Sequence, residues 1–190
     1  MSIIICPGIH EPALTERFIS GFSSLLSDRS IGNKTVDILV FPAEGFLALS
    51  SLHILQFLRD RLKDKLESPV IFISFSAGVV GAIVAAWQWQ LLGGHVKAFI
   101  AIDGWGMPLW GNFPIHLLSH DYFTHWSSTV LGRRRDDFYA EPSVDHLTMW
   151  RSPQTVQGWW VETSTDISQT PVRLSAAEFL YSLIKRYDEK

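Results

Sequence analysis

Short runs of apolar, often β-branched residues alternate along this chain with longer segments in which apolar residues recur every three or four positions. Runs of the first kind predict buried strands, and segments of the second kind predict amphipathic helices. The predicted strands cover residues 3–6, 36–41, 69–74, 96–102, 114–119 and 137–140. The predicted helices cover residues 12–26, 50–67, 77–92, 122–131, 153–161 and 175–187.

Strands that are apolar on both faces and are separated by helices are typical of a parallel sheet covered on both sides. The sequence therefore predicts an α/β protein, a three-layer α/β/α sandwich with a mostly parallel sheet of about six strands. No linker rich in proline, glycine or serine divides the 190 residues. We therefore expect a single domain over residues 1–190.

Composition narrows the classes of protein and partner. Charged residues make up only 18% of the chain, which excludes disorder as its main state, and the formal net charge of −3 argues against a nucleic-acid partner. The longest apolar run, residues 77–87, is well short of the ~20 residues that a membrane span needs. We therefore expect no membrane span and a cytoplasmic protein. The single cysteine, Cys6, excludes an internal disulfide.

The most informative segment is Ser74-Phe-Ser76-Ala-Gly78, where a predicted buried strand runs directly into a predicted helix. A sharp turn at this point forces the central residue into a positive-φ conformation and lifts its side chain away from the backbone. The residues two before and two after it must be small, because the turn brings them together. The segment resembles the nucleophile elbow of α/β-hydrolases, usually Gly-x-Ser-x-Gly, with Ser74 in place of the first glycine. The alternative is an ordinary turn with a serine that caps a helix.

The resemblance implies a minimal α/β-hydrolase fold without a separate cap, in which Ser76 is the nucleophile and no cofactor or metal is needed. The amide of Ala77, at the start of the helix, would hold one side of the oxyanion. The amide of Ile9, in the loop after the first strand, would hold the other side. With right-handed crossovers, the family's topology places the strands in the spatial order 36–41, 2–6, 69–74, 96–102, 114–119, 137–140.

The family's chain order of serine, acid and then histidine selects the other members of a triad. Asp121 follows the fifth predicted strand and matches the acid, and His146 follows the sixth and matches the base. Asp103 directly ends the fourth predicted strand and is the alternative acid. His120 and His125, which flank Asp121, are the alternative bases.

Large apolar residues gather in two loops that follow predicted strands and should emerge beside Ser76. One loop contains Phe46, and the other contains Trp105 and Trp110. Together with His10, these side chains are expected to line an apolar substrate pocket. The alternative is that the two tryptophans only fill the core.

Three histidines raise the question of a metal site. His116 and His120 share a face at strand spacing, and His125 follows them. Three imidazoles can bind zinc, but this spacing matches no zinc signature. We therefore expect no metal.

Together these features predict a serine hydrolase that acts on a small or acyl ester or thioester through Ser76, His146 and Asp121 and a covalent acyl-enzyme. The expected partner is a small-molecule ester or acyl substrate, and the oligomeric state stays open. The fold also hosts proteins that only bind, and Ser74 and Pro7 depart from the family's motifs. The alternative is therefore a catalytically inactive α/β-hydrolase-like binding or scaffold protein.

Overall fold

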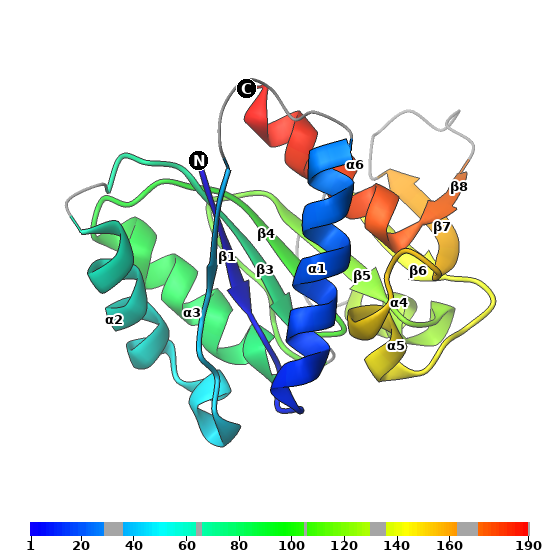
Figure 1. Cartoon of the computed structure of the whole chain (residues 1–190), viewed down its shortest axis with the longest axis horizontal. Helices are drawn as coiled ribbons and strands as arrows, with labels where there is room; N and C mark the ends of the chain where they lie inside the picture. The colour runs from blue at the N-terminus through cyan, green and yellow to red at the C-terminus, as the bar shows by residue number, and fades with distance from the viewer. Residues whose placement is uncertain (29–35, 64–65, 105, 130–135, 163–170, 190) are drawn as a thin grey trace.

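The computed structural model describes residues 1–28, 36–63, 66–104, 106–129, 136–162 and 171–189. Over these residues the chain forms one eight-stranded sheet in the spatial order β2-β1-β3-β4-β5-β6-β7-β8 (Figure 1). The strands are β1 (Ser2–Cys6), β2 (Asp37–Val40), β3 (Val70–Phe75), β4 (Val96–Ile102), β5 (Ile115–Ser119), β6 (Asp136–Ala140), β7 (Gln157–Glu162) and β8 (Val172–Ser175). The helices are α1 (Pro12–Asp28), the 3-10 helix η1 (Gly45–Leu49), α2 (Ser51–Leu62), α3 (Ala77–Leu91), α4 (Tyr122–Thr129), α5 (His146–Arg151) and α6 (Ala176–Asp188).

The chain is an α/β protein with a mixed sheet. Strands β2, β1, β3, β4, β5 and β6 run parallel, in the spatial order that the sequence predicts. Strands β7 and β8 continue the sheet in the antiparallel direction. The expectation of a sheet of about six strands is therefore wrong, because two further strands are added beyond β6.

Strand β7 lies in the segment 153–161, which the sequence predicts to be helical. Trp160 packs edge-on against Phe179 of α6, with ring centroids 5.3 Å apart. Gly158 permits a close approach to β6, since a Cβ at this position would lie 2.1 Å from the carbonyl oxygen of Tyr139. The strand forms because these residues fit the edge of β6 and the surface of α6, and this packing outweighs the local pattern.

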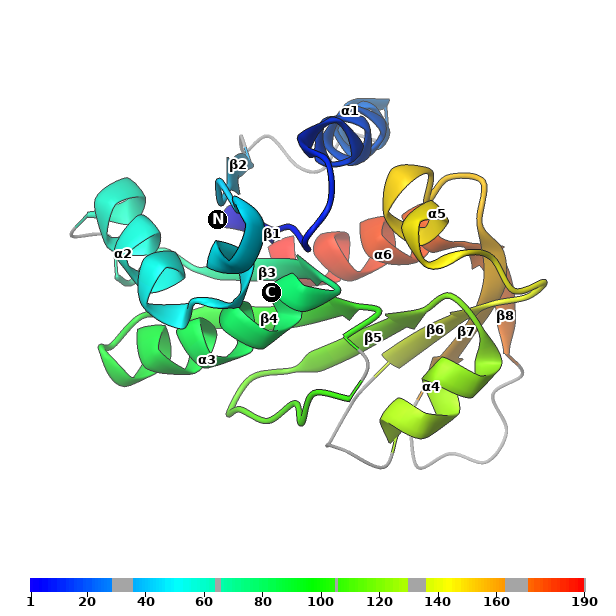
Figure 2. The same cartoon turned by 90° about the horizontal axis from the view of Figure 1, so that it is seen from below.

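Helices cover both faces of the sheet (Figure 2). Helices α1, α5 and α6 lie on one face, and α2, α3 and α4 lie on the other. Two apolar clusters fill the space between these layers, and the side chains of β1 alternate between them. Ile3 and Ile5 belong to the first cluster, whereas Ile4 and Cys6 belong to the second. Burial on both faces is the reason that the strands read as continuous apolar runs.

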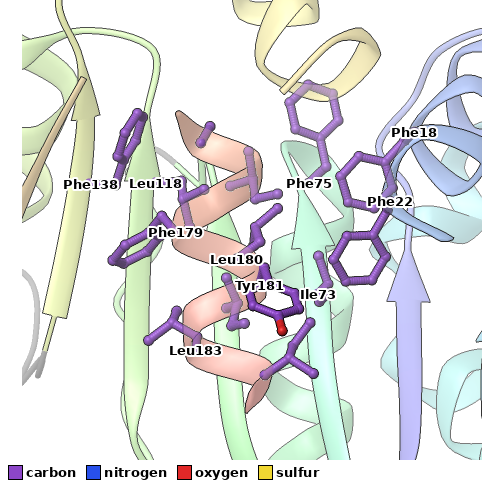
Figure 3. Close-up of a cluster of buried hydrophobic side chains, with 14 of the residues drawn as sticks. Phe18, Phe22, Ile73, Phe75, Leu118, Phe138, Phe179, Leu180, Tyr181 and Leu183 are labelled. Carbon is purple, nitrogen blue, oxygen red and sulfur yellow. The ribbon is translucent and has the colours of Figure 1, made fainter. Parts of the chain in front are cut away.

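Helix α6 packs against the first cluster through one apolar stripe (Figure 3). Phe179, Leu180 and Leu183 of this stripe are fully buried, and each contributes ~1.5–3 kcal/mol by leaving water. A capping box fixes the start of the helix: Ser175 Oγ accepts from the Glu178 N–H, and the Glu178 carboxylate accepts from the Ser175 N–H. The helix thereby holds one side of β3, β4 and β6.

The other predicted helices differ from the structure mainly at their ends. Helix α2 ends at Leu62, earlier than predicted, and Lys63 follows with a φ of 48°. The predicted end of the helix 122–131 lies outside the described residues. Helix α5, only six residues long, is not predicted. Among the described residues, no helix has both the length and the apolar character needed to cross a membrane.

Candidate active site

Ser76 occupies the sharp turn between β3 and α3. Its φ of 51° and ψ of −125° are a combination that residues other than glycine seldom adopt. The Ser76 N–H donates to the Ile102 carbonyl at 2.9 Å, which ties the turn to the end of β4. Gly78 is required on the far side of the turn, because a Cβ there would lie 2.3 Å from the Pro7 carbonyl oxygen. Ser76 is therefore held at the carboxyl edge of the parallel strands.

His146 begins helix α5 and reaches Ser76 from the other side of the sheet edge. Its Nε2 lies 2.9 Å from Ser76 Oγ. The carboxylate of Asp145 accepts from the Thr148 N–H at 3.0 Å, which caps the helix and fixes where His146 stands. The imidazole stacks on the ring of Phe75, the residue before Ser76, with centroids 4.7 Å apart. Helix, cap and ring together orient the imidazole toward the serine.

Asp103 holds the other nitrogen of His146. Asp103 Oδ2 lies 2.9 Å from His146 Nδ1, so a proton on Nδ1 is donated to the carboxylate and Nε2 is left to accept from the serine hydroxyl. Asp103 directly follows β4 with a φ of 50°, and its side chain is 1% exposed. Burial alone would raise the pKa of this carboxyl, but the hydrogen bonds from His120 and His146 outweigh burial and lower the pKa. The group is therefore a carboxylate at neutral pH.

Asp121, the first choice of acid from the sequence, is not brought to His146. Its Oδ1 accepts from the Thr124 N–H at 2.6 Å and so caps the start of α4. The structure pairs His146 with Asp103, the alternative acid, which corrects the choice of Asp121. The physical reason lies in the backbone. The positive φ at Asp103 turns its carboxylate toward His146, whereas Asp121 lies at the start of α4 and its carboxylate caps that helix.

His120 is a second imidazole on the same carboxylate. Its backbone N–H donates to Asp103 Oδ1 at 2.9 Å, and its Nδ1 lies 3.1 Å from the same oxygen, in ion-pair contact at a poor hydrogen-bond angle. Its Nε2 lies 3.5 Å from Asp121 Oδ2. The close contact of Nδ1 with the Asp103 carboxylate is the largest cause of a raised His120 pKa. Asp103 is therefore flanked by two imidazoles.

The loop after β1 passes directly beside Ser76. A Cβ at Gly8 would lie 3.0 Å from Ser76 Cβ and 3.0 Å from the Phe75 carbonyl oxygen. Ile9, the expected second oxyanion donor, comes next in the chain. Ala77, the expected first donor, opens α3, where the first N–H groups of a helix have no partner within it. Both predicted donors therefore belong to backbone that borders Ser76.

A cavity of about 310 Å³ opens over the serine. It is lined by Ser76, Ala77, Val80, Asp103, His120, Thr124 and His146. A second cavity, of about 330 Å³, lies between the loop after β1, the start of α1 and the segment after β2. Gly8 lines the second cavity and packs against Ser76, so the two cavities flank the same short loop.

The four predicted pocket residues have different fates. His10 lines the second cavity, and its ring lies 5.7 Å from that of Phe75. Phe46 is 83% exposed and lines neither cavity. The ring of Trp110 lies against that of Trp87, with centroids 5.0 Å apart and planes inclined by 57°. Trp87 is three turns along α3 from the serine, which is ~16 Å of helix. Trp105 lies outside the described residues. Among the described residues of these two loops, Phe46 and Trp110 thus do not line the cavity over the serine.

The three histidines considered for a metal site, His116, His120 and His125, do not come together. His116 bonds to the Asp136 carbonyl and the Tyr187 hydroxyl, at 2.9 and 2.8 Å, whereas His125 lies 4.0 Å from Asp137. A different set, Asp103, His120 and His146, is the one group in the described part of the chain that brings three potential metal ligands within 4.8 Å of one another. Its ligand atoms spread over up to 4.8 Å, whereas a tetrahedral zinc site with ~2.1 Å bonds needs about 3.4 Å between ligands.

Cys6 is not a nucleophile in this site. Burial raises the pKa of its thiol to about 12, so the thiol stays protonated and unreactive. Its carbonyl oxygen would lie 2.5 Å from a Cβ at Gly78, which makes Cys6 part of the wall behind the turn.

In comparisons with known proteins, no protein-family model matches this chain, and no curated protein matches it. What the site does must therefore follow from its own geometry.

Two features of the site are missed by sequence reasoning. The contact of His120 with Asp103 crosses from β5 to β4, and its only signal in the sequence is a histidine just past the end of a strand. Val80 and Thr124 line the cavity over Ser76 from α3 and α4. Val80 lies one helical turn after Ser76, so its position follows from the predicted elbow and helix.

Proposed function

We propose that this protein is a serine hydrolase in which Ser76 is the nucleophile, His146 the general base and Asp103 the acid that orients the base. One observation carries the proposal: Ser76 Oγ, His146 and Asp103 form a continuous hydrogen-bonded chain with two links of 2.9 Å. This chain has the geometry in which an imidazole takes a serine proton while a carboxylate stabilises the resulting imidazolium.

The order of chemical steps follows from this arrangement. His146 Nε2 accepts the proton of Ser76 as Oγ attacks the carbonyl carbon of an ester or thioester. The amides of Ile9 and Ala77 stabilise the oxyanion, and His146 then gives its proton to the leaving alcohol or thiol. Water repeats the attack on the acyl-enzyme, again with His146 as base, and releases the carboxylic acid and the free serine.

The fold supports the same proposal. Six parallel strands in the order given above, with a positive-φ serine between β3 and α3, resemble the minimal α/β-hydrolase fold. The protein would be a variant of this fold, since two antiparallel strands extend the sheet and the acid follows β4. No resident metal or cofactor has a part in these steps.

The substrate class follows from the cavity over Ser76. About 310 Å³ accommodates a small acyl or alcohol group, and the walls carry the polar groups of Thr124 and His120. The second cavity, beyond the loop at Gly8, has largely apolar walls and would take the other part of the ester. We therefore propose a small or medium-length ester or thioester as the substrate.

A fluorophosphonate probe tests the proposal, because it forms a covalent bond only with an activated serine. The wild-type protein is expected to be labelled, and Ser76→Ala is expected to abolish labelling. Ser74→Ala is the matched control: it removes the neighbouring, fully buried serine hydroxyl and should leave labelling in place. Complete inertness of the wild-type protein would contradict the proposal and favour a binding or scaffold protein on the same fold.

A further inference from the structure

We propose that His120 is a positioning residue that sits on Asp103 opposite His146 and, as a cation, opposes a second positive charge on the same carboxylate. This inference rests on the proposed function, because it concerns the base of the same site. It adds a fourth side chain to the hydrogen-bonded set of Ser76, His146 and Asp103.

The contacts place His120 on the opposite oxygen of the acid. Asp103 Oδ2 takes the bond from His146 Nδ1, and Oδ1 takes both the His120 backbone N–H at 2.9 Å and His120 Nδ1 at 3.1 Å. The carboxylate is almost completely enclosed, with 1% of its side chain exposed. Water therefore does little to screen it, and the two imidazoles share one negative charge.

His120 also supports the segment that carries the base. The Val144 N–H donates to the His120 carbonyl at 3.1 Å, two residues before His146. The rings of His120 and His146 meet edge to face, with centroids 6.0 Å apart. One residue at the end of β5 thus touches the acid through its side chain and anchors the approach to α5 through its backbone.

The groups around His120 favour its charged form. Asp103 faces it from the end of β4, Asp121 lies next to it in the chain with Oδ2 3.5 Å from Nε2, and Asp145 and His146 face it from α5. The close contact with the Asp103 carboxylate raises the pKa of His120 above its usual 6.5, and the charges of Asp121 and Asp145 act in the same direction. His120 therefore stays a cation at pH values where an ordinary histidine begins to lose its proton.

A cation at this place changes the behaviour of the base. A proton on His146 would put a second positive charge on the same carboxylate, about 6.0 Å from the first. Repulsion between two such charges in a partly solvated site is equivalent to about a tenfold change in proton affinity. His120 therefore opposes the uptake of a further proton by the site as a whole, and labelling of the serine should persist to lower pH.

The test is the pH dependence of the rate of fluorophosphonate labelling between pH 5 and 9. His120→Gln removes the cation, and the midpoint of the acid limb should move up by about one pH unit, so that labelling at pH 5.5 falls about tenfold. Toward pH 9, as His120 of the wild-type protein loses its proton, the two rates should converge. A loss by the same factor at every pH would show a merely structural role and overturn the proposal.

Two further variants make the result specific to charge at this position. His120→Lys restores a cation and should return the midpoint toward the wild-type value, which a loss of packing would not do. His53→Gln is the matched control, since His53 is a histidine of α2 whose Nδ1 bonds to Ser50 Oγ in an exposed position. It should leave the profile unchanged. If His120→Lys behaves like His120→Gln, the charge has no part and the proposal is overturned.

NMR titration of the imidazoles tests the pairing without any need for catalysis. The His120 signals of the wild-type protein should titrate above pH 6.5, and Asp103→Asn should lower that midpoint. An unchanged midpoint in Asp103→Asn overturns this inference even if the wild-type protein is labelled. A wild-type protein that is never labelled but retains this coupling overturns the proposed function and, with it, a role of His120 in catalysis.

Discussion

The ring of Phe75 lies nearly parallel to the imidazole of His146, with centroids 4.7 Å apart and planes inclined by 23°. Phe75 is the last residue of β3 and directly precedes Ser76, and its ring also lies 5.0 Å from that of Trp150 of α5. Figure 3 shows Phe75 reaching from β3 toward α5, beside Phe18. Strand β3 therefore leads directly into Ser76 and, through the ring of Phe75, also holds the imidazole of His146 in place.

Phe75→Leu is expected to loosen His146 and slow labelling of Ser76. The stack is worth ~0.5–1.5 kcal/mol, so the labelling rate should fall about 2-fold to 10-fold, and the smaller side chain should lower the free energy of unfolding by about 1–2 kcal/mol. Phe72→Leu is the control, because Phe72 of the same strand packs in the other cluster against Phe99. It should cost similar stability and leave the rate unchanged. Equal rates for both variants would contradict a role for the stack.

Gly78→Ala is expected to distort the turn at Ser76. The new Cβ would lie 2.3 and 2.5 Å from the carbonyl oxygens of Pro7 and Cys6, so backbone must move. The free energy of unfolding should fall by about 1–3 kcal/mol or more, and labelling should fall with it because the loop beside the serine shifts. Chemical denaturation and labelling measure both effects.

Gly21→Ala is the matched control for this clash. A Cβ at Gly21, in helix α1, would meet Gln154 Oε1 at an ordinary 3.5 Å. Alanine is better than glycine inside a helix by ~0.5–1 kcal/mol, so this variant should be as stable as the wild-type protein or more stable. A Gly78→Ala protein as stable as Gly21→Ala would contradict the packing described here.

The Asp103–His120 pair predicts how stability depends on pH. The pKa of His120 is raised in the folded protein, so its contribution is fully present below pH 6.5 and is lost as the pH rises through the raised pKa. The pKa of Asp103 is lowered, so its contribution is present above pH 3.8 and is lost as the pH falls through the lowered pKa. His120→Gln should therefore lower the urea midpoint more at pH 6 than at pH 9. An equal loss at both pH values would contradict the pairing.

The parallel part of the sheet could be predicted because burial on both faces leaves a strong signal. The strands β1 and β3 are wholly apolar apart from Ser2 and Ser74, and each is followed by a long helix, α1 after β1 and α3 after β3. Strand β7 was missed because Trp159 and Trp160 give no clean alternation, and the strand depends on β6 and α6, which lie far away in the chain.

The candidate site could be predicted in part. Ser76, and the backbone of Ile9 and Ala77 beside it, could be predicted from local motifs. His146 could be predicted from the order of elements along the chain. The choice between Asp103 and Asp121 could not, because it depends on a backbone angle at the end of β4 and on which carboxylate a neighbouring helix uses as its cap. For the same reason the sequence gives no sign of how far Trp110 lies from Ser76.

The central claim is that Asp103 orients His146 toward Ser76, and the second-order rate constants of fluorophosphonate labelling for Asp103→Asn and Asp121→Asn test it most directly. An asparagine at the acid position leaves the imidazole in the wrong tautomer, so Asp103→Asn should reduce the rate by about 10³–10⁴. Asp121→Asn keeps an oxygen that can cap α4 and removes one charge near His120, so at neutral pH it should stay within about threefold of the wild-type protein. A large loss in Asp121→Asn with near-normal labelling of Asp103→Asn would contradict the account.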